Sequence, residues 1–385
     1  MNQQLETHSH RRYNILTGEW VLVSPHRTKR PWQGKTETTF KKEKLAYDTE
    51  CYLCPTNTRV NGIVNENYKN TNVFANDFGA LLKDTPTFDF KNGLLQAEGE
   101  SGICKVICFS PNHSITIPEM EVEDLVKVVE TWQSEYAELG SLSAINYVQI
   151  FENKGAIMGC SNPHPHGQIW AQRSIPTEIQ KKTNMQKVFY QKESASLLQT
   201  YIEQELKEGV RVICENKNFV TLIPFWAVWP YEAMIVPKRQ MATIGELTIT
   251  EKKDFAQQLK ILTQKYDLLF DTSFPYSSGI HQAPTESGLD YSNNLIKVYK
   301  QEDSGLLTGG GIGNLLSVSV IHYLFRVQSV LRTRGIINQM IFISETIMLY
   351  DIFHFNLFES GKRLTGMQYI PEALILILSQ NLIIN

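Results

Sequence analysis

The chain has 385 residues, with 37 Lys and Arg against 40 Asp and Glu and a formal net charge of -3. This length suffices for two domains or one large repeated domain, and the balanced charge gives no bulk attraction to nucleic acid or to a membrane surface. The N-terminus lacks the apolar segment of a secretory signal, and no stretch of the first 300 residues is apolar for long enough to span a bilayer. We therefore expect a cytoplasmic protein, in which any phosphate chemistry must come from a local site.

Strand-like and helix-like segments occupy the first three quarters of the sequence. Runs of β-branched and apolar residues predict strands at Glu19–Val23, Thr71–Phe74, Cys104–Phe109, Ile145–Glu152, Phe219–Pro224 and Ala233–Pro237. Apolar residues at helical spacing predict two amphipathic helices, Glu121–Leu139 and Thr250–Phe270. Together these elements predict an α+β protein.

A basic turn follows the first predicted strand. The segment SPHRTKRPWQG, residues 24–34, places Arg27 and Arg30 beside a lysine, and guanidinium groups suit phosphate oxygens. A solvated surface loop is the alternative interpretation. Further along, FANDFGAL places Asn76 and Asp77 between aromatic residues, which is a suitable setting for a ribose and a base.

Cys51 and Cys54, in the segment ECYLCP, have the two-residue spacing of half a zinc site. Tetrahedral zinc needs two more ligands, and the best candidates are His113, in the turn after the third predicted strand, and His164. A redox dithiol is the alternative for the cysteine pair, but nothing like a thioredoxin-type helix start follows Cys54. Most of the other four cysteines are interpreted as small buried hydrophobic residues.

The segment GCSNPHPHGQIW, residues 159–170, is the most informative part of the sequence. Pro163 and Pro165 restrict the backbone around two histidines and favour an extended conformation. On an extended strand, an H-x-H pattern directs both histidine side chains to one face. A lone histidine is usually an ordinary core or surface residue, whereas two inside Pro-His-Pro-His-Gly-Gln indicate a functional site.

A neutral imidazole is a nucleophile toward phosphorus near pH 7, so this segment predicts that His166 carries a phosphoryl group. The ring then needs a carbonyl to fix its tautomer. The phosphate oxygens need donors, for which Ser161, Gln168 and the amides of the Gly159 turn are candidates. Asn153, which follows a predicted strand, is placed to reach a ligand hydroxyl.

The order of elements around the two predicted helices is repeated. A strand ending in Pro111 or Pro237 leads to a connector, a helix and a segment that carries histidine. The period is about 120 to 130 residues. This repeat predicts two similar units that share one extended, mostly antiparallel sheet with flanking helices.

The composition changes after about Ser292. From there to Asn385 the chain is rich in Ile and Leu, has few helix caps or hairpin turns, and ends in EALILILSQNLIIN. A packed helical region and a segment poorly matched to the preceding fold are both compatible with this composition. The cluster from Gly309 to Gly313 lacks the strand and helix of a dinucleotide-binding loop and is interpreted as a turn.

Taken together, these segments resemble galactose-1-phosphate uridylyltransferase, a branch of the histidine-triad superfamily. The resemblance runs from about Arg11 to Thr285 and is carried by RRYNILTGEWVLVSPHRTKRPWQG, CYLCP, FANDFGAL, VICFSPNHSITIPEM, FENKGAIMGCSNPHPHGQIWA, PFWAVWPYE and SFPYSSGIHQAPT. It implies one histidine-triad-like unit over residues 1–175, an incomplete second unit over 176–292, and a divergent segment over 293–385.

The resemblance implies a ping-pong reaction. His166 would attack the α-phosphorus of UDP-glucose, release glucose 1-phosphate and hold uridylate until galactose 1-phosphate takes it. The residues in the positions of the family's zinc ligands, for one ion per subunit, are Cys51, Cys54, His113 and His164. Gln168 and Ser161 would steady the phosphoryl group. The implied contacts to the nucleotide sugar are Arg27, Arg30, Val60, Asn76, Asp77, Asn153, Gly159 and Cys160. A homodimer without nucleic-acid or membrane partners is also implied.

The sequence departs from the family pattern after HQAPTESGLDYS. The family's H-x-H segment and its basic, aromatic continuation are missing, and His322 and His354 lie in no similar context. A second metal site would need His281 and a glutamate, but Lys182 stands at the glutamate position. We therefore expect the second metal to be absent, and we hypothesise a frameshift or an unusual splice near Ser292.

Two other functions remain open from the sequence. One is a dinucleoside polyphosphate hydrolase or phosphorylase of the same superfamily, which would use the same histidine with water or phosphate as acceptor. The other is a zinc-stabilised module that binds nucleotide sugars without turnover. The segments around Val60, Asn76 and Asn153 favour the uridylyltransferase over the hydrolase.

Overall fold

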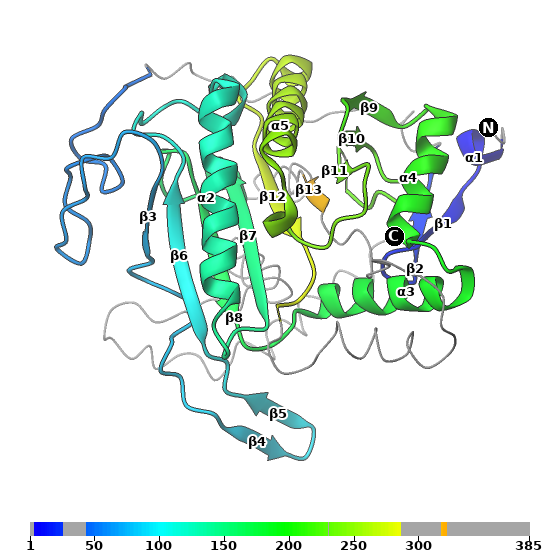
Figure 1. Ribbon diagram of the computed structural model, residues 1–385, viewed down its shortest axis with the longest axis horizontal. Helices are drawn as coiled ribbons and strands as arrows, with labels where there is room; N and C mark the ends of the chain where they lie inside the picture. Colours follow the sequence, from blue (N-terminus) through cyan, green and yellow to red (C-terminus); the bar gives the residue numbers. More distant parts are fainter. Residues whose placement is uncertain (1–3, 26–43, 230, 286–316, 322–385) are drawn as a thin grey trace, which may run out of the picture. The chain divides into compact units, whose positions relative to one another are not determined.

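The computed structural model describes residues 4–25, 44–229, 231–285 and 317–321 (Figure 1), and all of these belong to one compact unit. Several features named above lie outside the described residues: Arg27, Arg30, the glycine cluster, His322, His354 and all of the predicted divergent segment except 317–321. Among the described helices, none combines the length and apolarity needed to cross a membrane.

A nine-stranded sheet organises the described part of the chain. In spatial order its strands are β3 (Asn72–Ala75), β6 (Gly102–Cys108), β8 (His166–Gln172), β7 (Tyr147–Lys154), β12 (Tyr276–His281), β13 (Ser317–Ile321), β11 (Ala233–Pro237), β10 (Phe219–Leu222) and β9 (Val212–Glu215). Each neighbouring pair is antiparallel. Two separate hairpins are formed by β1 (His10–Asn14) with β2 (Glu19–Val23) and by β4 (Asp89–Asn92) with β5 (Leu95–Glu98). The predicted α+β architecture with an extended antiparallel sheet is confirmed.

Two long helices cover one face of this sheet, α2 (Val122–Gly140) and α5 (Ile249–Phe270) (Figure 1). Leu125 of α2 and Leu259 of α5 belong to one core cluster with Ile150 of β7 and Ile169 of β8. Burying each such side chain stabilises the fold by about 1.5–3 kcal/mol. Because side chains alternate along a strand, the polar side chains of β8 face the other way.

The remaining helices are α1 (Gln4–Thr7), α3 (Thr177–Glu193) and α4 (Leu197–Glu208). A second core cluster joins Leu198 and Ile202 of α4 to Val220 of β10 and Val236 of β11. The sequence prediction missed both α3 and α4. The buried positions of α3 include Thr183 and Gln186, so the helix lacks the continuous apolar stripe that marks an amphipathic helix.

The repeat predicted from the sequence is visible in the order of elements. A short 3-10 helix, η2 (Ile117–Glu119), precedes α2, and a matching one, η4 (Ile244–Glu246), precedes α5. In both, a glutamate accepts a hydrogen bond from a threonine amide: Glu119 from Thr116 at 3.2 Å and Glu246 from Thr243 at 3.0 Å. The helices are followed by β7 and β8 in the first case and by β12 and β13 in the second, and both strand pairs enter the same sheet.

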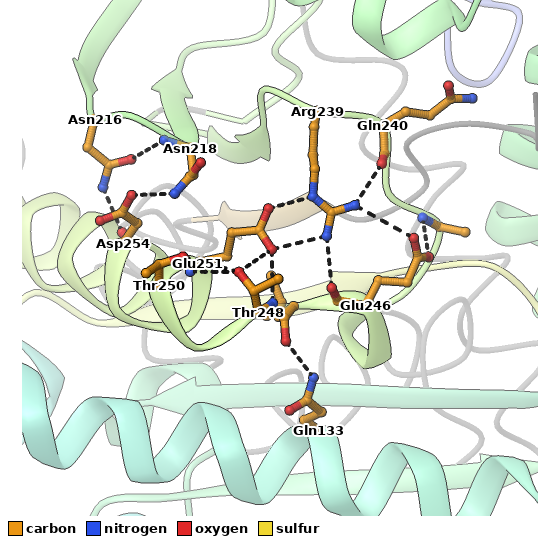
Figure 2. A network of polar contacts seen from close by, with 12 residues as sticks. Gln133, Asn216, Asn218, Arg239, Gln240, Glu246, Thr248, Thr250, Glu251 and Asp254 are labelled. Carbon is orange, nitrogen blue, oxygen red and sulfur yellow. Dashed lines mark hydrogen bonds and ion pairs between the residues drawn. The ribbon is translucent and has the colours of Figure 1, made fainter. Parts of the chain in front are cut away.

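A polar network fixes the start of α5 (Figure 2). Glu251, which is only 5% exposed, accepts hydrogen bonds from the Thr248 amide at 2.9 Å and from the Arg239 guanidinium. Asn218 donates to Asp254 at 2.7 Å, so the turn between β9 and β10 is tied to the same helix. The guanidinium of Arg239 lowers the pKa of Glu251 to about 2, and the network therefore carries its charge over the whole neutral range.

Candidate active site and metal centre

Strand β8 presents its polar side chains on the face of the sheet away from α2. Ile169 belongs to the core beneath α2, and because side chains alternate along a strand, His166, Gln168 and Trp170 point to the opposite face. In the sheet register, His166 lies opposite Cys108 of β6 and Gln168 lies opposite Phe151 of β7. The central position of β8 holds these side chains on a rigid support.

Four potential metal ligands gather at one end of β6 and β8. Cys51 and Cys54, in a turn before β3, meet His113 after β6 and His164 just before β8, and all four residues are buried. Their ligand atoms lie within 4.8 Å of one another. Cys54 Sγ is 3.5 Å from Nδ1 of His164 and 3.6 Å from Nδ1 of His113. The predicted grouping of two thiols and two imidazoles is present.

The outer ring nitrogens of the two histidines have oxygen partners. His164 Nε2 is 2.9 Å from the carbonyl oxygen of Ser110, and His113 Nε2 is 3.8 Å from a carboxylate oxygen of Asp48. A carbonyl can only accept, so Nε2 of His164 carries the proton and Nδ1 presents a lone pair to the thiols. Orientation of ligating histidines by such oxygen partners is typical of metal sites in proteins.

The electrostatics of the cluster also suit a bound cation. Burial raises the pKa of the Cys54 thiol to about 11 and lowers that of the His164 imidazole to about 4. Both groups are therefore neutral at pH 7 in the protein alone, and a cation would reverse the preference of the thiol. Two sulfurs and two nitrogens are a donor set that zinc prefers, so the residues present fit a metal ion.

His166 adjoins the cluster through the backbone of His164. Its Nδ1 lies 2.7 Å from the carbonyl oxygen of His164. Because that oxygen can only accept, Nδ1 carries the ring proton and Nε2 keeps its lone pair. Burial lowers the pKa of the His166 imidazole, which also favours the neutral, nucleophilic form. His164 thus contributes its ring to the cluster and its carbonyl to His166.

Gln168 is held by two side chains. The indole Nε1 of Trp170 donates to Gln168 Oε1 at 3.0 Å, and Asn76 Nδ2 donates to the same oxygen at 3.4 Å. Asn76 is fixed in turn, because its Oδ1 accepts from the amide of Phe78 at 3.0 Å. The structure thus brings together two residues, Asn76 and Gln168, that the sequence had assigned to one site.

Asp77 is engaged by two neighbours that the sequence did not single out. Arg59 donates to Asp77 Oδ1 at 3.2 Å and Asn61 donates to it at 2.6 Å. The Arg59 guanidinium also stacks on the ring of Phe74, 4.2 Å from its centroid. Val60, which lies between Arg59 and Asn61 in the sequence, is 62% exposed, so its side chain is accessible to a ligand.

The last group of predicted contacts lies at the end of β7 and in the loop that follows. Ser277 of β12 donates to Asn153 Oδ1 at 2.7 Å. Gly159 has a φ of 80°, a conformation that side chains rarely adopt. Cys160 Sγ donates to the carbonyl of Asn162 at 3.0 Å. Ser161, which lies between Cys160 and Asn162 in the sequence, is exposed.

Lys182 and His281 form a pair where the family resemblance places a second metal. Lys182 Nζ lies 3.1 Å from Nδ1 of His281. Burial lowers the pKa of the Lys182 ammonium to about 8. An ammonium donates hydrogen bonds and offers no lone pair, so these two residues do not fit a metal ion.

Several contact residues could not be found from the sequence. Arg59 and Asn61 lie outside the segments singled out in the sequence, and Trp170 and Ser277 lie inside two of them without being marked individually. For Trp170 the available signal was its i+2 spacing from Gln168 in a segment expected to be extended. Ser277 and Asn153 are far apart in sequence and meet only through the pairing of β12 with β7.

The sequence matches known proteins over most of its length. Residues 1–176 match the family model of the galactose-1-phosphate uridyl transferase N-terminal domain, and residues 178–301 match that of its C-terminal domain. The chain is 45% identical over 301 residues to the galactose-1-phosphate uridylyltransferase of Saccharomyces cerevisiae, covering 75% of this chain and 82% of that protein. It is 48% identical over 281 residues to the enzyme of that name from Haemophilus influenzae, covering 72% and 79%.

Solved structures show the same fold. An ADP-glucose phosphorylase from Arabidopsis thaliana, with ADP-glucose bound, superposes with a TM-score of 0.61 at 21% identity, covering 82% of this chain and 89% of that one. A uridylyltransferase superposes with a TM-score of 0.58 at 23% identity, covering 81% and 85%. Since two family models cover most of the sequence and close relatives share nearly half of the aligned residues, this chain belongs to the galactose-1-phosphate uridylyltransferase family.

Proposed function

We propose that the protein transfers uridylate between UDP-glucose and galactose 1-phosphate through a covalent uridylyl group on His166. The observation that carries this proposal is the 2.7 Å contact between His166 Nδ1 and the carbonyl of His164. It leaves Nε2 unprotonated and fixes the ring beside the metal cluster. The family membership supports the choice of substrates.

In the first half-reaction, Nε2 of His166 attacks the α-phosphorus of UDP-glucose. An N–P bond forms, the bond from that phosphorus to the bridging oxygen breaks, and glucose 1-phosphate leaves with the electron pair. In the second half-reaction a phosphate oxygen of galactose 1-phosphate attacks the same phosphorus. The N–P bond breaks, UDP-galactose leaves, and His166 is regenerated. The Nδ1–H bond to the carbonyl stabilises the positive charge that the ring carries in the intermediate.

The roles of the other residues follow from the resemblance to the family. Gln168 and Ser161 donate to the phosphoryl oxygens, where they stabilise charge in the transition state. The nucleotide sugar is contacted by Arg27, Arg30, Val60, Asn76, Asp77, Asn153, Gly159 and Cys160. Arg59 and Asn61 both donate to Asp77. These hydrogen bonds fix the position of its carboxylate before any ligand binds.

The metal proposed for Cys51, Cys54, His113 and His164 is a single zinc ion. Zinc bound there would cross-link the turn before β3 to the strand ends of β6 and β8, a structural role. The His164 carbonyl is then held at a fixed place for His166. A second metal is not proposed, because Lys182 occupies the position of a ligand.

The domain division into residues 1–175 and 176–292, the homodimer and the cytoplasmic location remain predictions. The extents of the two family-model matches support the division. The segment 293–385 is proposed to reduce activity, because it replaces the family's basic, aromatic continuation. Multi-angle light scattering of the purified protein tests the dimer.

The proposed function is tested by incubating the full chain with UDP-glucose labelled in the α-phosphate. We expect label on the wild-type protein and none on His166→Gly. The labelled protein is then offered galactose 1-phosphate, inorganic phosphate or water. Transfer to galactose 1-phosphate supports the proposal, whereas release only by phosphate or water indicates a phosphorylase or hydrolase. Binding of UDP-glucose without any label indicates a non-catalytic binding module.

A further inference from the structure

We propose that Trp170 is a positioning residue that fixes which end of the Gln168 amide faces the phosphoryl group. This inference rests on the proposed function, because it concerns the residue that meets the transferred phosphoryl. Trp170 touches neither substrate nor His166 in this role. It acts through Gln168, whose Oε1 accepts the indole N–H at 3.0 Å.

The direction of this hydrogen bond is set by chemistry. An indole N–H can only donate, so the Gln168 atom that it meets must be the carbonyl oxygen. If the amide were rotated by half a turn, the NH2 group would face the indole N–H, and two donors would oppose each other in a partly buried place. The indole N–H would then lack an acceptor, and leaving a buried donor unsatisfied costs about 1–3 kcal/mol.

A second chain of contacts reaches the same oxygen independently. The backbone amide of Phe78 can only donate, so the Asn76 atom at 3.0 Å from it is Oδ1. The NH2 group of Asn76 therefore points to Gln168 Oε1, at 3.4 Å. An indole and a backbone amide, from two separate parts of the chain, thus select the same orientation of Gln168.

Among the described residues, this orientation leaves the NH2 group of Gln168 without a hydrogen-bond partner. Gln168 and His166 are two residues apart on β8 and lie on the same face. An NH2 group there donates to the anionic oxygens of a phosphoryl group on His166, whereas a carbonyl oxygen would repel them. Preorganised donors of this kind stabilise the transition state without reorganisation during the reaction.

Trp170 is itself held in place. It is only 9% exposed, and its ring packs edge-on against Phe151 of β7, with centroids 5.5 Å apart and planes at 85°. The indole N–H therefore has little freedom to leave Gln168. Replacement by phenylalanine keeps an aromatic ring in this packing and removes the donor.

The kinetic test uses Trp170→Phe, Gln168→Ala and the double variant. For Trp170→Phe we expect kcat for uridylyl transfer to fall about tenfold, as for the loss of one correctly placed hydrogen bond, with KM for UDP-glucose little changed. In the Gln168→Ala background, Trp170→Phe should cause no further loss, because a residue that acts through another has no effect once that residue is gone. Wild-type kcat in Trp170→Phe, or losses that multiply in the double variant, would overturn the proposal.

A second readout does not depend on activity. In protein with 15N-labelled tryptophan, the indole resonance of Trp170 is assigned by its disappearance in Trp170→Phe. We expect Gln168→Leu to shift this proton resonance upfield, because the acceptor is removed. The indole of Trp132, whose Nε1 has no hydrogen-bond partner within the described part of the chain, serves as the control and should not move. An unchanged Trp170 resonance refutes the contact, while a wild-type protein that never labels His166 refutes the proposed function instead.

Discussion

His164 takes part in the site with two different groups. Its ring faces the thiol of Cys54, and its carbonyl oxygen accepts from Nδ1 of His166. An alternating H-x-H pattern makes this possible, because the carbonyl of the first histidine lies within reach of the ring of the second. At the scale of single residues, the candidate metal site and the proposed nucleophile therefore share one amino acid.

Loss of a cluster ligand should affect both functions of His164. We expect Cys54→Ser to lose most of its bound zinc and to label poorly at His166, because structural zinc contributes folding free energy directly. Zinc is measured by elemental analysis after gel filtration, and labelling by the assay above. Cys214→Ser is the matched control, since that thiol bonds Gln258 outside the cluster. Full zinc content in Cys54→Ser would contradict the assignment.

Glu152 gives a prediction on pH dependence. Burial raises the pKa of its carboxyl to about 7, although Tyr276 donates to it at 2.8 Å and Lys154, which pairs with Asp267, is nearby. The folded protein therefore holds a proton that the unfolded chain releases near its ordinary pKa of about 4.3. Stability should fall as pH rises from about 4.3 through about 7.

The Glu152→Gln variant removes this titration and keeps the shape of the side chain. We expect it to be more stable than the wild type at pH 8, by roughly 1 to 3 kcal/mol, and equal to it near pH 4. Urea unfolding at both pH values measures the difference. A variant less stable than the wild type at pH 8 would show that Lys154 compensates the buried charge.

At the scale of elements, the start of α5 depends on residues outside the helix. Arg239 follows the end of β11, and Asn218 lies before β10, yet both bond residues of the first turns of the helix (Figure 2). The first amides of a helix lack partners within the helix. Here the Thr248 hydroxyl accepts from the Glu251 amide, and the Glu251 carboxylate accepts from the Thr248 amide. Arg239 neutralises that carboxylate. The helix is therefore fixed to the sheet at the end where its own hydrogen bonds are missing.

The Glu251→Gln variant tests this anchor. We expect a loss of about 2 kcal/mol at pH 7, the range for hydrogen bonds to a charged group. The folded pKa of Glu251 is lowered, so its contribution is present above the unfolded pKa of about 4.3 and disappears as pH falls toward about 2. The variant and the wild type should converge in urea unfolding below pH 3. Glu130→Gln, which breaks the exposed ion pair with Lys252, should change stability little.

At the scale of the whole described unit, the two repeats meet in one sheet. Strand β12 of the second repeat pairs with β7 of the first, and this pairing places Ser277 against Asn153. Ser277 donates to the carbonyl end of the Asn153 amide, which orients the NH2 end away from Ser277. The second repeat therefore contributes to the site that the first repeat carries.

Ser277→Ala should weaken substrate binding without affecting the nucleophile. We expect KM for UDP-glucose to rise about three- to tenfold, as for one hydrogen bond, with little change in the rate of His166 labelling at saturating substrate. Steady-state kinetics and single-turnover labelling separate the two effects. Ser278→Ala is the matched control, because Ser278 lines the opposite, helix-covered face with Phe255 and Leu259. Equal effects of both substitutions would argue against a specific role.

The amino-acid sequence alone determined the α+β class, the helices α2 and α5, the histidine segment and, to within two residues at each end, the strands β2, β3, β6, β7, β10 and β11. These features depend on short-range patterns: side-chain periodicity, proline next to histidine, and cysteine spacing. The four candidate metal ligands could also be named, because their residue types restrict the chemistry. Helix α3 was missed because its buried positions are partly polar.

Only the tertiary structure decided which groups face each other. The contacts of Asn76 with Gln168 and of Ser277 with Asn153 join residues whose partners no local pattern reveals. The structure also decided which atoms meet where Trp170 contacts Gln168 and where Lys182 contacts His281. Hydrogen-bond direction depends on which donor and acceptor atoms meet, and that follows from strand register and packing. The sequence determined which chemical groups the site contains, and the pairing of strands from two repeats determined how they are oriented.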